Sequence, residues 1–327
     1  MKRLSPLAWT SLAAVLSSPA LALASPPDAR TTTPPLLASD EPSVSHLVRG
    51  GAYLYWARDH ELVRMPTAGG KAEVLWSTRK YIVDLTLRGD SVFALLKNDR
   101  ESLDAGDLVH LALGRRVVAR SVPGGGDRSE KDMIATDGKQ VFWATHGASP
   151  RGTVNRGAVA SQRPTRLYTS DGPVPAALAV DGADLYYFVD HELYRAPVAG
   201  GAAVVVQKLP DLVRRMAFDE GHIYLAVRRL TAPDHVSFDV DVIPRAGGQV
   251  QRLATGEGRI CDLAVDGASV YWTDMDERTV KRVGKRGGVP SVLARDPHQP
   301  CWLALDETRL YWSSSGNGIA TVSSLPR

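Results

Sequence analysis

The stretch Leu263-Ala-Val-Asp-Gly-Ala-Ser-Val-Tyr-Trp-Thr-Asp274 joins two short apolar segments through an Asp-Gly turn. Asp-Gly between two runs of β-branched and aromatic residues is a strong signal for a β-hairpin. Both runs are apolar at successive positions, which is typical of strands that are covered on both faces of their sheet. The stretch therefore predicts two paired strands in a sheet that has a neighbour on each side.

The same phrase recurs along the chain. Its first aromatic residue stands at Tyr55, Phe93, Phe142, Tyr186, Tyr224, Tyr271 and Tyr311. Successive copies lie 38 to 49 residues apart, which fits one blade of a propeller and does not fit helical repeats. We therefore predict an all-β fold, a seven-bladed β-propeller of four-stranded antiparallel blades, as a single domain over residues 34–327.

Four copies carry a second landmark, a strand that ends in a Gly-Gly turn. These stretches are Leu62–Gly70, Leu193–Gly201, Val242–Gly248 and Val280–Gly288. Glycine supplies the positive φ that tight hairpin turns need. Each blade is thus expected to contain strand A before the Asp turn, the aromatic strand B, strand C before the Gly-Gly turn, and an outer strand D.

The last copy ends at Ile319–Pro326, which matches a strand C, and no strand D follows it. Near the other end of the chain, Thr33–Asp40 resembles Val289–Asp296, a strand D of the preceding copy. We expect Leu36–Ser39 to supply the outer strand of the last blade. Closure of the ring in this way covers strand edges that favour aggregation.

The first 24 residues have the pattern of a secretory signal peptide. Lys2 and Arg3 precede a mostly apolar run, and Ala22-Leu23-Ala24 is a small-x-small cleavage site. We expect residues 25–33 to be a flexible linker, and the protein to be periplasmic or extracellular after cleavage. No later stretch reaches the ~20 apolar residues that span a bilayer, so no membrane span is expected.

The segment Tyr271-Trp-Thr-Asp274 and the Leu-Ala-Val-Asp phrase before it resemble the YWTD repeats of low-density-lipoprotein-receptor-type propellers. The chain also resembles secreted bacterial propellers of unknown function. Partial copies stand at Tyr55-Trp56, Phe142-Trp143 and Tyr311-Trp312. The resemblance implies a propeller fold. Because that family usually has six blades, a six-bladed ring is the alternative to the seven phrases counted here.

The two cysteines, Cys261 and Cys301, occupy the same repeat position in neighbouring copies, at the start of strand A. Inner strands of adjacent blades come close together near the channel, and an exported protein meets an oxidising compartment. We expect a disulfide between them, with two buried free thiols as the alternative. A redox or metal pair is disfavoured because no Cys-x-x-Cys motif or nearby histidine cluster exists.

Candidate ligand-binding residues lie where strands A begin, at one rim of the channel. They are Asp84, Asp132, Arg214, Arg215, Asp262, His298 and Trp302. One interpretation is a polar pocket with an aromatic wall, since function in such folds concentrates at the channel mouth. The other is solvated charge with ion pairs between blades. Segments 97–107, 145–163 and 228–239 follow strands B and lengthen the same rim, which suggests a recognition face.

The repeats account for most of the polar residues, and no catalytic constellation stands out. The main functional hypothesis is therefore a non-catalytic binding or protein-interaction scaffold, monomeric, with an unknown protein or polymer ligand on one rim. The alternative is a channel-mouth enzyme of lactonase or lyase type, with Ca²⁺ held by Asp84, Asp132 and Asp262. Apart from Ca²⁺, no cofactor or metal is expected. The near-neutral formal charge of +3, without a concentrated basic field, argues against a nucleic-acid partner.

Overall fold

The computed structural model comprises two compact units, Met1–Arg30 and Thr31–Arg327. It describes residues 34–89, 91–98, 107–113, 117–122, 134–146, 152–158, 165–169, 175–232 and 235–327, all in the second unit. The expected signal peptide and linker fall outside the described residues. Within these ranges the chain forms strands and turns and no helix, and therefore no helix long and apolar enough to cross a membrane.

The strands of the first four blades follow one another in chain order. Blade 1 contains β2 (Ser45–Gly50), β3 (Tyr53–Arg58), β4 (Glu61–Pro66) and β5 (Glu73–Ser77). Blade 2 contains β6 (Tyr81–Arg88), β7 (Ser91–Lys97), β8 (Asp107–Leu113) and β9 (Val117–Val122). Blade 3 contains β10 (Ile134–Thr136), β11 (Gln140–His146), β12 (Gly152–Ala158) and β13 (Thr165–Thr169). Blade 4 contains β14 (Leu178–Asp181), β15 (Asp184–Val189), β16 (Glu192–Pro197) and β17 (Val204–Lys208).

The last three blades include the one that joins the two ends of the unit. Blade 5 contains β18 (Leu212–Phe218), β19 (His222–Ala232), β20 (His235–Pro244) and β21 (Gln251–Glu257). Blade 6 contains β22 (Ile260–Val265), β23 (Ser269–Asp274), β24 (Thr279–Gly284) and β25 (Ser291–Arg295). Blade 7 contains β26 (Gln299–Leu305), β27 (Arg309–Gly316), β28 (Ile319–Pro326) and β1 (Leu36–Glu41).

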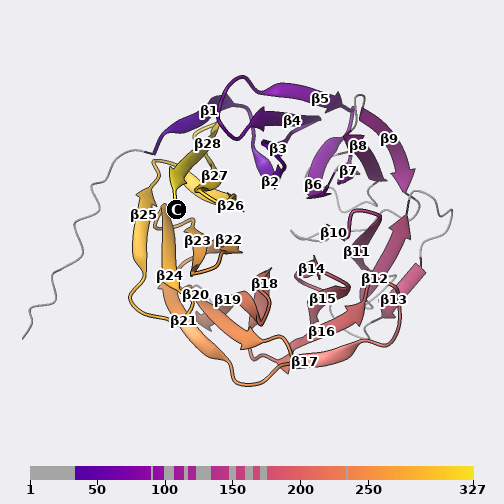
Figure 1. The fold of residues 1–327 in the computed structure, drawn as a ribbon, viewed down its shortest axis with the longest axis vertical. Helices are drawn as coiled ribbons and strands as arrows, with labels where there is room; N and C mark the ends of the chain where they lie inside the picture. The colour runs from indigo at the N-terminus through magenta and orange to yellow at the C-terminus, as the bar shows by residue number, and fades with distance from the viewer. Residues whose placement is uncertain are drawn as a thin grey trace, which may run out of the picture. The chain divides into compact units, whose positions relative to one another are not determined.

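The seven antiparallel sheets stand in a ring, with strands β2, β6, β10, β14, β18, β22 and β26 innermost (Figure 1). The predicted seven-bladed propeller is confirmed, and the six-bladed alternative is wrong. We call the rim at which these inner strands begin the D–A rim, and the rim of the turns between strands A and B the A–B rim. Turns between strands B and C lie on the D–A rim.

Closure by the N-terminal strand is also confirmed. Strand β1 pairs antiparallel with β28, with Leu36 opposite Ser323 and Glu41 opposite Ala320. Glu41 is buried, and its carboxylate accepts a hydrogen bond of 3.1 Å from Arg58 of blade 1. The strand therefore completes blade 7 and also ties it to the next blade.

The aromatic residues of the repeat fill the space between blades. Trp56, Trp143, Trp272 and Trp312 are all fully buried. Trp272 of blade 6 packs in one cluster with Tyr224 and Phe238 of blade 5, for example. Burial of such side chains contributes about 1.5–3 kcal/mol each. This packing on both faces explains why the strand B segments are apolar at successive positions.

The turn aspartate has a structural role. Oδ1 of Asp266 accepts hydrogen bonds from the backbone N–H groups of Ala268 and Ser269, both at 2.8 Å, and Oδ2 accepts one from the Tyr271 hydroxyl at 2.8 Å. Arg327 of blade 7 adds an ion pair at 2.9 Å. Burial opposes the charged carboxylate, but these four partners together lower the pKa of Asp266. The aspartate thus holds its hairpin and the neighbouring blade.

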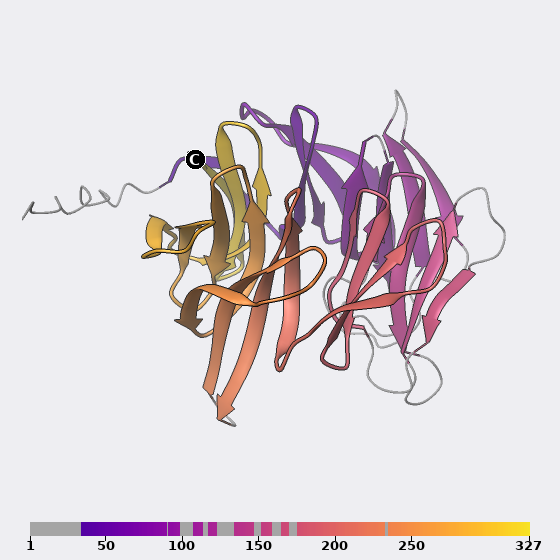
Figure 2. The ribbon, with the colours of Figure 1, turned by 60° about the horizontal axis from the view of Figure 1, so that its bottom comes forward.

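Two of the segments expected to lengthen the rim contain regular strands. In residues 145–163, Gly152–Ala158 forms β12, the third strand of blade 3. Residues 228–232 and 235–239 lie in β19 and β20. These strands have 11 and 10 residues and make the longest hairpin in the described part of the chain. Figure 2 shows this hairpin reaching beyond the other described strands at the D–A rim. In blade 5 the rim is therefore lengthened by a sheet extension.

Candidate functional site

One position of the inner strand recurs around the channel, directly before the apolar residue that opens the repeat phrase. In the described blades it is occupied by His46, Asp84, Ala177, Arg215, Asp262 and Trp302. In five of these inner strands the pairing with strand B shifts at this position, as a β-bulge does. A bulge adds a residue and redirects its side chain. All six residues line one central cavity of about 310 Å³.

Five of these side chains form a continuous chain of contacts across the cavity. The Arg215 Nε lies 3.3 Å from Oδ1 of Asp262, and its guanidinium carbon lies 4.7 Å from the centre of the Trp302 ring. The His46 ring centroid lies 4.1 Å from that of Trp302. His46 Nε2 in turn lies 3.3 Å from Oδ1 of Asp84. Two acid–base pairs therefore flank one tryptophan.

Burial controls the charges of this cluster. Burial raises the pKa of Asp262, although Arg215 and two backbone N–H groups act in the opposite direction. Burial lowers the pKa of Arg215, against the pull of Asp262 and Asp84. Each charge is thus tolerated because its partner is present. Removal of one member of a buried pair typically costs about 3–5 kcal/mol.

The two aspartates also clamp neighbouring blades together. Asp84 accepts hydrogen bonds from its own blade at Leu85 N, 2.7 Å, and from the next blade at Ile134 N, 3.2 Å. Asp262 repeats the arrangement, with Leu263 N at 2.9 Å and Leu303 N of blade 7 at 2.8 Å. Both oxygens of each carboxylate are therefore directed at backbone donors.

Asp84 and Asp262 were expected to be calcium ligands, but their oxygens accept hydrogen bonds from backbone N–H groups. Among the described residues, no group of three His, Cys, Asp or Glu side chains is placed to hold a metal ion. The third expected ligand, Asp132, lies outside those residues. Asp84 and Asp262 have the geometry of structural clamps.

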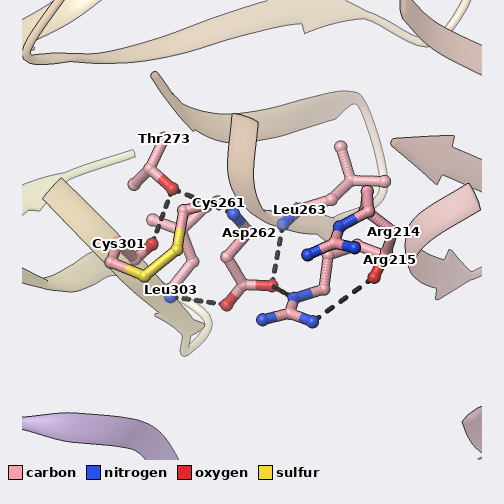
Figure 3. Close-up of a disulfide and its surroundings, with 8 residues drawn as sticks. All are labelled: Arg214, Arg215, Cys261, Asp262, Leu263, Thr273, Cys301 and Leu303. Atoms are coloured by element: carbon pink, nitrogen blue, oxygen red, sulfur yellow. Dashed lines mark hydrogen bonds and ion pairs between the residues drawn. A yellow bond between two sulfur atoms is a disulfide. The ribbon is translucent and has the colours of Figure 1, made fainter. Parts of the chain in front are cut away.

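The expected disulfide between Cys261 and Cys301 is confirmed, and the free-thiol alternative is wrong (Figure 3). Each cysteine directly precedes a residue of the cavity, Asp262 or Trp302. The Thr273 hydroxyl bridges the same seam, since it accepts a hydrogen bond from Asp262 N at 3.1 Å and donates one to the Cys301 carbonyl at 2.6 Å. Blades 6 and 7 are thus joined covalently and by hydrogen bonds at the D–A rim.

The structure brings together most of the candidate residues chosen from the sequence. Asp84, Arg215, Asp262 and Trp302 line the central cavity, and so does Arg214. His298 does not line it. Its backbone N–H donates to Asp296 in the loop before β26, and its ring lies beside Gly316 of β27.

Sequence reasoning missed the two other described residues at this recurring position, His46 and Ala177. An alignment of the seven copies on their apolar residue would have found both, because they stand directly before Leu47 and Leu178. His46 has a φ of 55°, a backbone conformation that is uncommon for residues other than glycine. The bulge at this position accounts for that conformation.

Comparisons with known proteins give the fold. No protein-family model matches the sequence, and no curated protein matches it. The structure is similar to a chain of the mitotic checkpoint complex, at 12% identity and a TM-score of 0.63, over 96% of this chain and 99% of that one. It is similar to BamB from Moraxella catarrhalis, at 16% identity and a TM-score of 0.51, over 84% and 81%. It is also similar to a chain of a nidogen/laminin complex, at 14% identity and a TM-score of 0.50, over 72% and 89%.

Proposed function

We propose that this protein is an exported, non-catalytic β-propeller that binds a protein partner at its D–A rim. The observation that carries the proposal is the β19–β20 hairpin, which raises one wall of that rim and lines a pocket that shares Arg214 and Arg215 with the central cavity. Rims lengthened on one side are typical of recognition faces on rigid scaffolds. The carboxylates of the cavity, by contrast, already serve the contacts between blades.

The structural neighbours agree with this proposal at the level of the fold. Two of them are chains from protein complexes, the nidogen/laminin complex and the mitotic checkpoint complex. The disulfide fits export to an oxidising compartment, periplasmic or extracellular, after removal of residues 1–24. The YWTD-like phrase also indicates a propeller. We propose that the unit acts as a monomer.

Site-specific photo-crosslinking in the native envelope tests the proposal. The photoreactive amino acid replaces Glu257, which is exposed on the D–A rim, or Arg286, which is exposed in the turn after β24 on the A–B rim. We expect one defined crosslinked protein from position 257 and none from position 286. Crosslinks of equal yield from both positions, or from position 286 alone, would contradict a partner on the D–A rim.

A further inference from the structure

A second pocket opens on the D–A rim between blades 5 and 6, next to the central cavity. Its volume is about 270 Å³, and its wall contains Arg214, Arg215, Arg228 and Arg259. No acidic residue belongs to the wall, whereas Phe238 and Ile260 contribute apolar surface. A pocket wall that contains four arginines, apolar side chains and no acid has a defined chemical preference.

The fold of blade 5 brings the arginines together. Arg214 and Arg215 are consecutive residues at the bulge of β18, so both side chains reach the region beside the Cys261–Cys301 disulfide (Figure 3). Arg228 belongs to the extended part of β19, where it pairs with Leu212 on one side and Phe238 on the other. The long hairpin thus supplies both a cation and an apolar wall.

Arg259, in the loop before β22, is held in place by Asp276. Its guanidinium donates two hydrogen bonds to Asp276 Oδ1, at 2.6 and 3.1 Å, and its backbone N–H donates to Oδ2 at 2.8 Å. Gly258 makes this contact possible, because a Cβ at that position would lie 2.5 Å from Oδ2 of Asp276. The Arg215 Nε lies 3.3 Å from Oδ1 of Asp262. Neither Asp262 nor Asp276 lines the pocket, so each carboxylate positions an arginine of the wall without adding negative charge to it.

We propose that this pocket binds an organic anion, a carboxylate or phosphate group carried on a short apolar body. Guanidinium groups in fixed positions bind such oxyanions through paired, charge-assisted hydrogen bonds. The volume is slightly below the range of about 300–1,000 Å³ that is typical of drug-sized ligands, which suits a small acid or the end of a peptide chain. The proposal rests on the function proposed above, since it names the chemistry that the D–A rim recognises.

Calorimetric titration of the full chain with N-acetyl-phenylalanine, its amide, and phenyl phosphate tests the proposal. We expect saturable binding of one acid molecule per chain, and binding of the amide that is weaker by at least about tenfold, because the amide lacks the charge. Equal affinity for the acid and the amide would overturn the proposal. So would the absence of measurable binding by both anions.

Arginine variants locate the site. Arg228 makes no ion pair within the described part of the chain, so Arg228→Gln leaves no buried carboxylate without a partner. We expect this variant to bind the acid at least about tenfold more weakly and to keep its melting temperature. The matched control is Arg286→Gln on the A–B rim, which should bind like the parent protein. Equal binding by Arg228→Gln and the parent would place the ligand elsewhere.

A longer probe separates two sources of the anion. If acetyl-Gly-Gly-Phe binds more tightly than N-acetyl-phenylalanine, the natural ligand is the chain end of a partner, and equal binding indicates a free acid. Both results support the pocket. Photo-crosslinking at position 257 reports on the partner independently, so a crosslink without acid binding would overturn this inference alone.

Discussion

Replacement of Asp262 by asparagine tests whether the cavity aspartates act as structural clamps. The side chain keeps its shape, but an amide NH2 group replaces one carboxylate oxygen. This NH2 group cannot accept a hydrogen bond. Asp262 now serves Leu263 N, Leu303 N and Arg215 together, so the variant removes the carboxylate charge that pairs with the buried Arg215 at 3.3 Å. Loss of one partner from a buried ion pair costs about 3–5 kcal/mol. We expect a loss of about 4 kcal/mol in the free energy of unfolding.

Guanidinium denaturation of the oxidised protein measures this loss. For a domain of this size the melting temperature should fall by roughly 10 °C. The double variant Asp262→Asn with Arg215→Met should recover more than half of the loss, because removal of both charges of a buried pair is often close to neutral. A loss below about 1 kcal/mol for the single variant, or additive losses in the double variant, would refute the clamp.

The exposed ion pair between Arg259 and Asp276 provides a matched control. The side chains of Arg259 and Asp276 are 53% and 39% exposed, against 10% and 15% for Arg215 and Asp262. Solvent screens the exposed pair, so Asp276→Asn should cost about 1 kcal/mol or less. Similar losses at both sites would show that burial does not govern the cost.

Three further predictions concern stability. Replacement of Cys261 and Cys301 by serine opens a link across a sequence separation of 40 residues and should cost about 4 kcal/mol in guanidinium denaturation; an unchanged midpoint would contradict it. Deletion of residues 34–40 removes most of β1 and uncovers β28, so the melting temperature should drop and aggregation should rise. An unchanged melting temperature without added aggregation would argue against closure by β1. Burial and the charge of Asp239 raise the pKa of Asp241 to about 6. The folded state then binds more protons than the unfolded state between pH ~4 and 6, so stability falls as pH rises through that window. In Asp241→Asn this fall should disappear, with a gain at pH 7 of at most about 3 kcal/mol, and unchanged pH dependence in urea melts would contradict it.

The repeat phrase was sufficient to predict the ring, because each copy carries local signals that agree with one another. The Asp turn, the aromatic strand and the Gly-Gly turn each specify a hairpin from a few neighbouring residues. Strand β1 was predictable because Leu36–Ser39 repeats the pattern of a strand D. Strand β12 was not, since Gly152–Ala158 has no apolar run and no Gly-Gly turn after it.

The cavity could be predicted only in part. Asp84, Arg215, Asp262 and Trp302 stand out as polar or aromatic residues at strand starts, but their alignment depends on a bulge in each of their four strands. A bulge shifts the pairing by one residue, and the packing of adjacent blades determines where it occurs. The extension of β19 and β20 was likewise hidden. Residues 228–239 contain neither the Asp-Gly turn nor the Gly-Gly turn of the repeat, so the sequence predicts only a lengthened rim. Pairing with β18 and β21 makes the extended strands part of blade 5.

The most direct test of the central claim is the affinity of the crosslinked partner for two charge-reversal variants. Arg228→Glu reverses a charge on the D–A rim, and Arg286→Glu makes the same change on the A–B rim. We expect Arg228→Glu to raise the equilibrium dissociation constant by at least about tenfold, and Arg286→Glu to leave it unchanged. Loss of affinity with Arg286→Glu and full affinity with Arg228→Glu would place the partner on the opposite rim and contradict the proposed function.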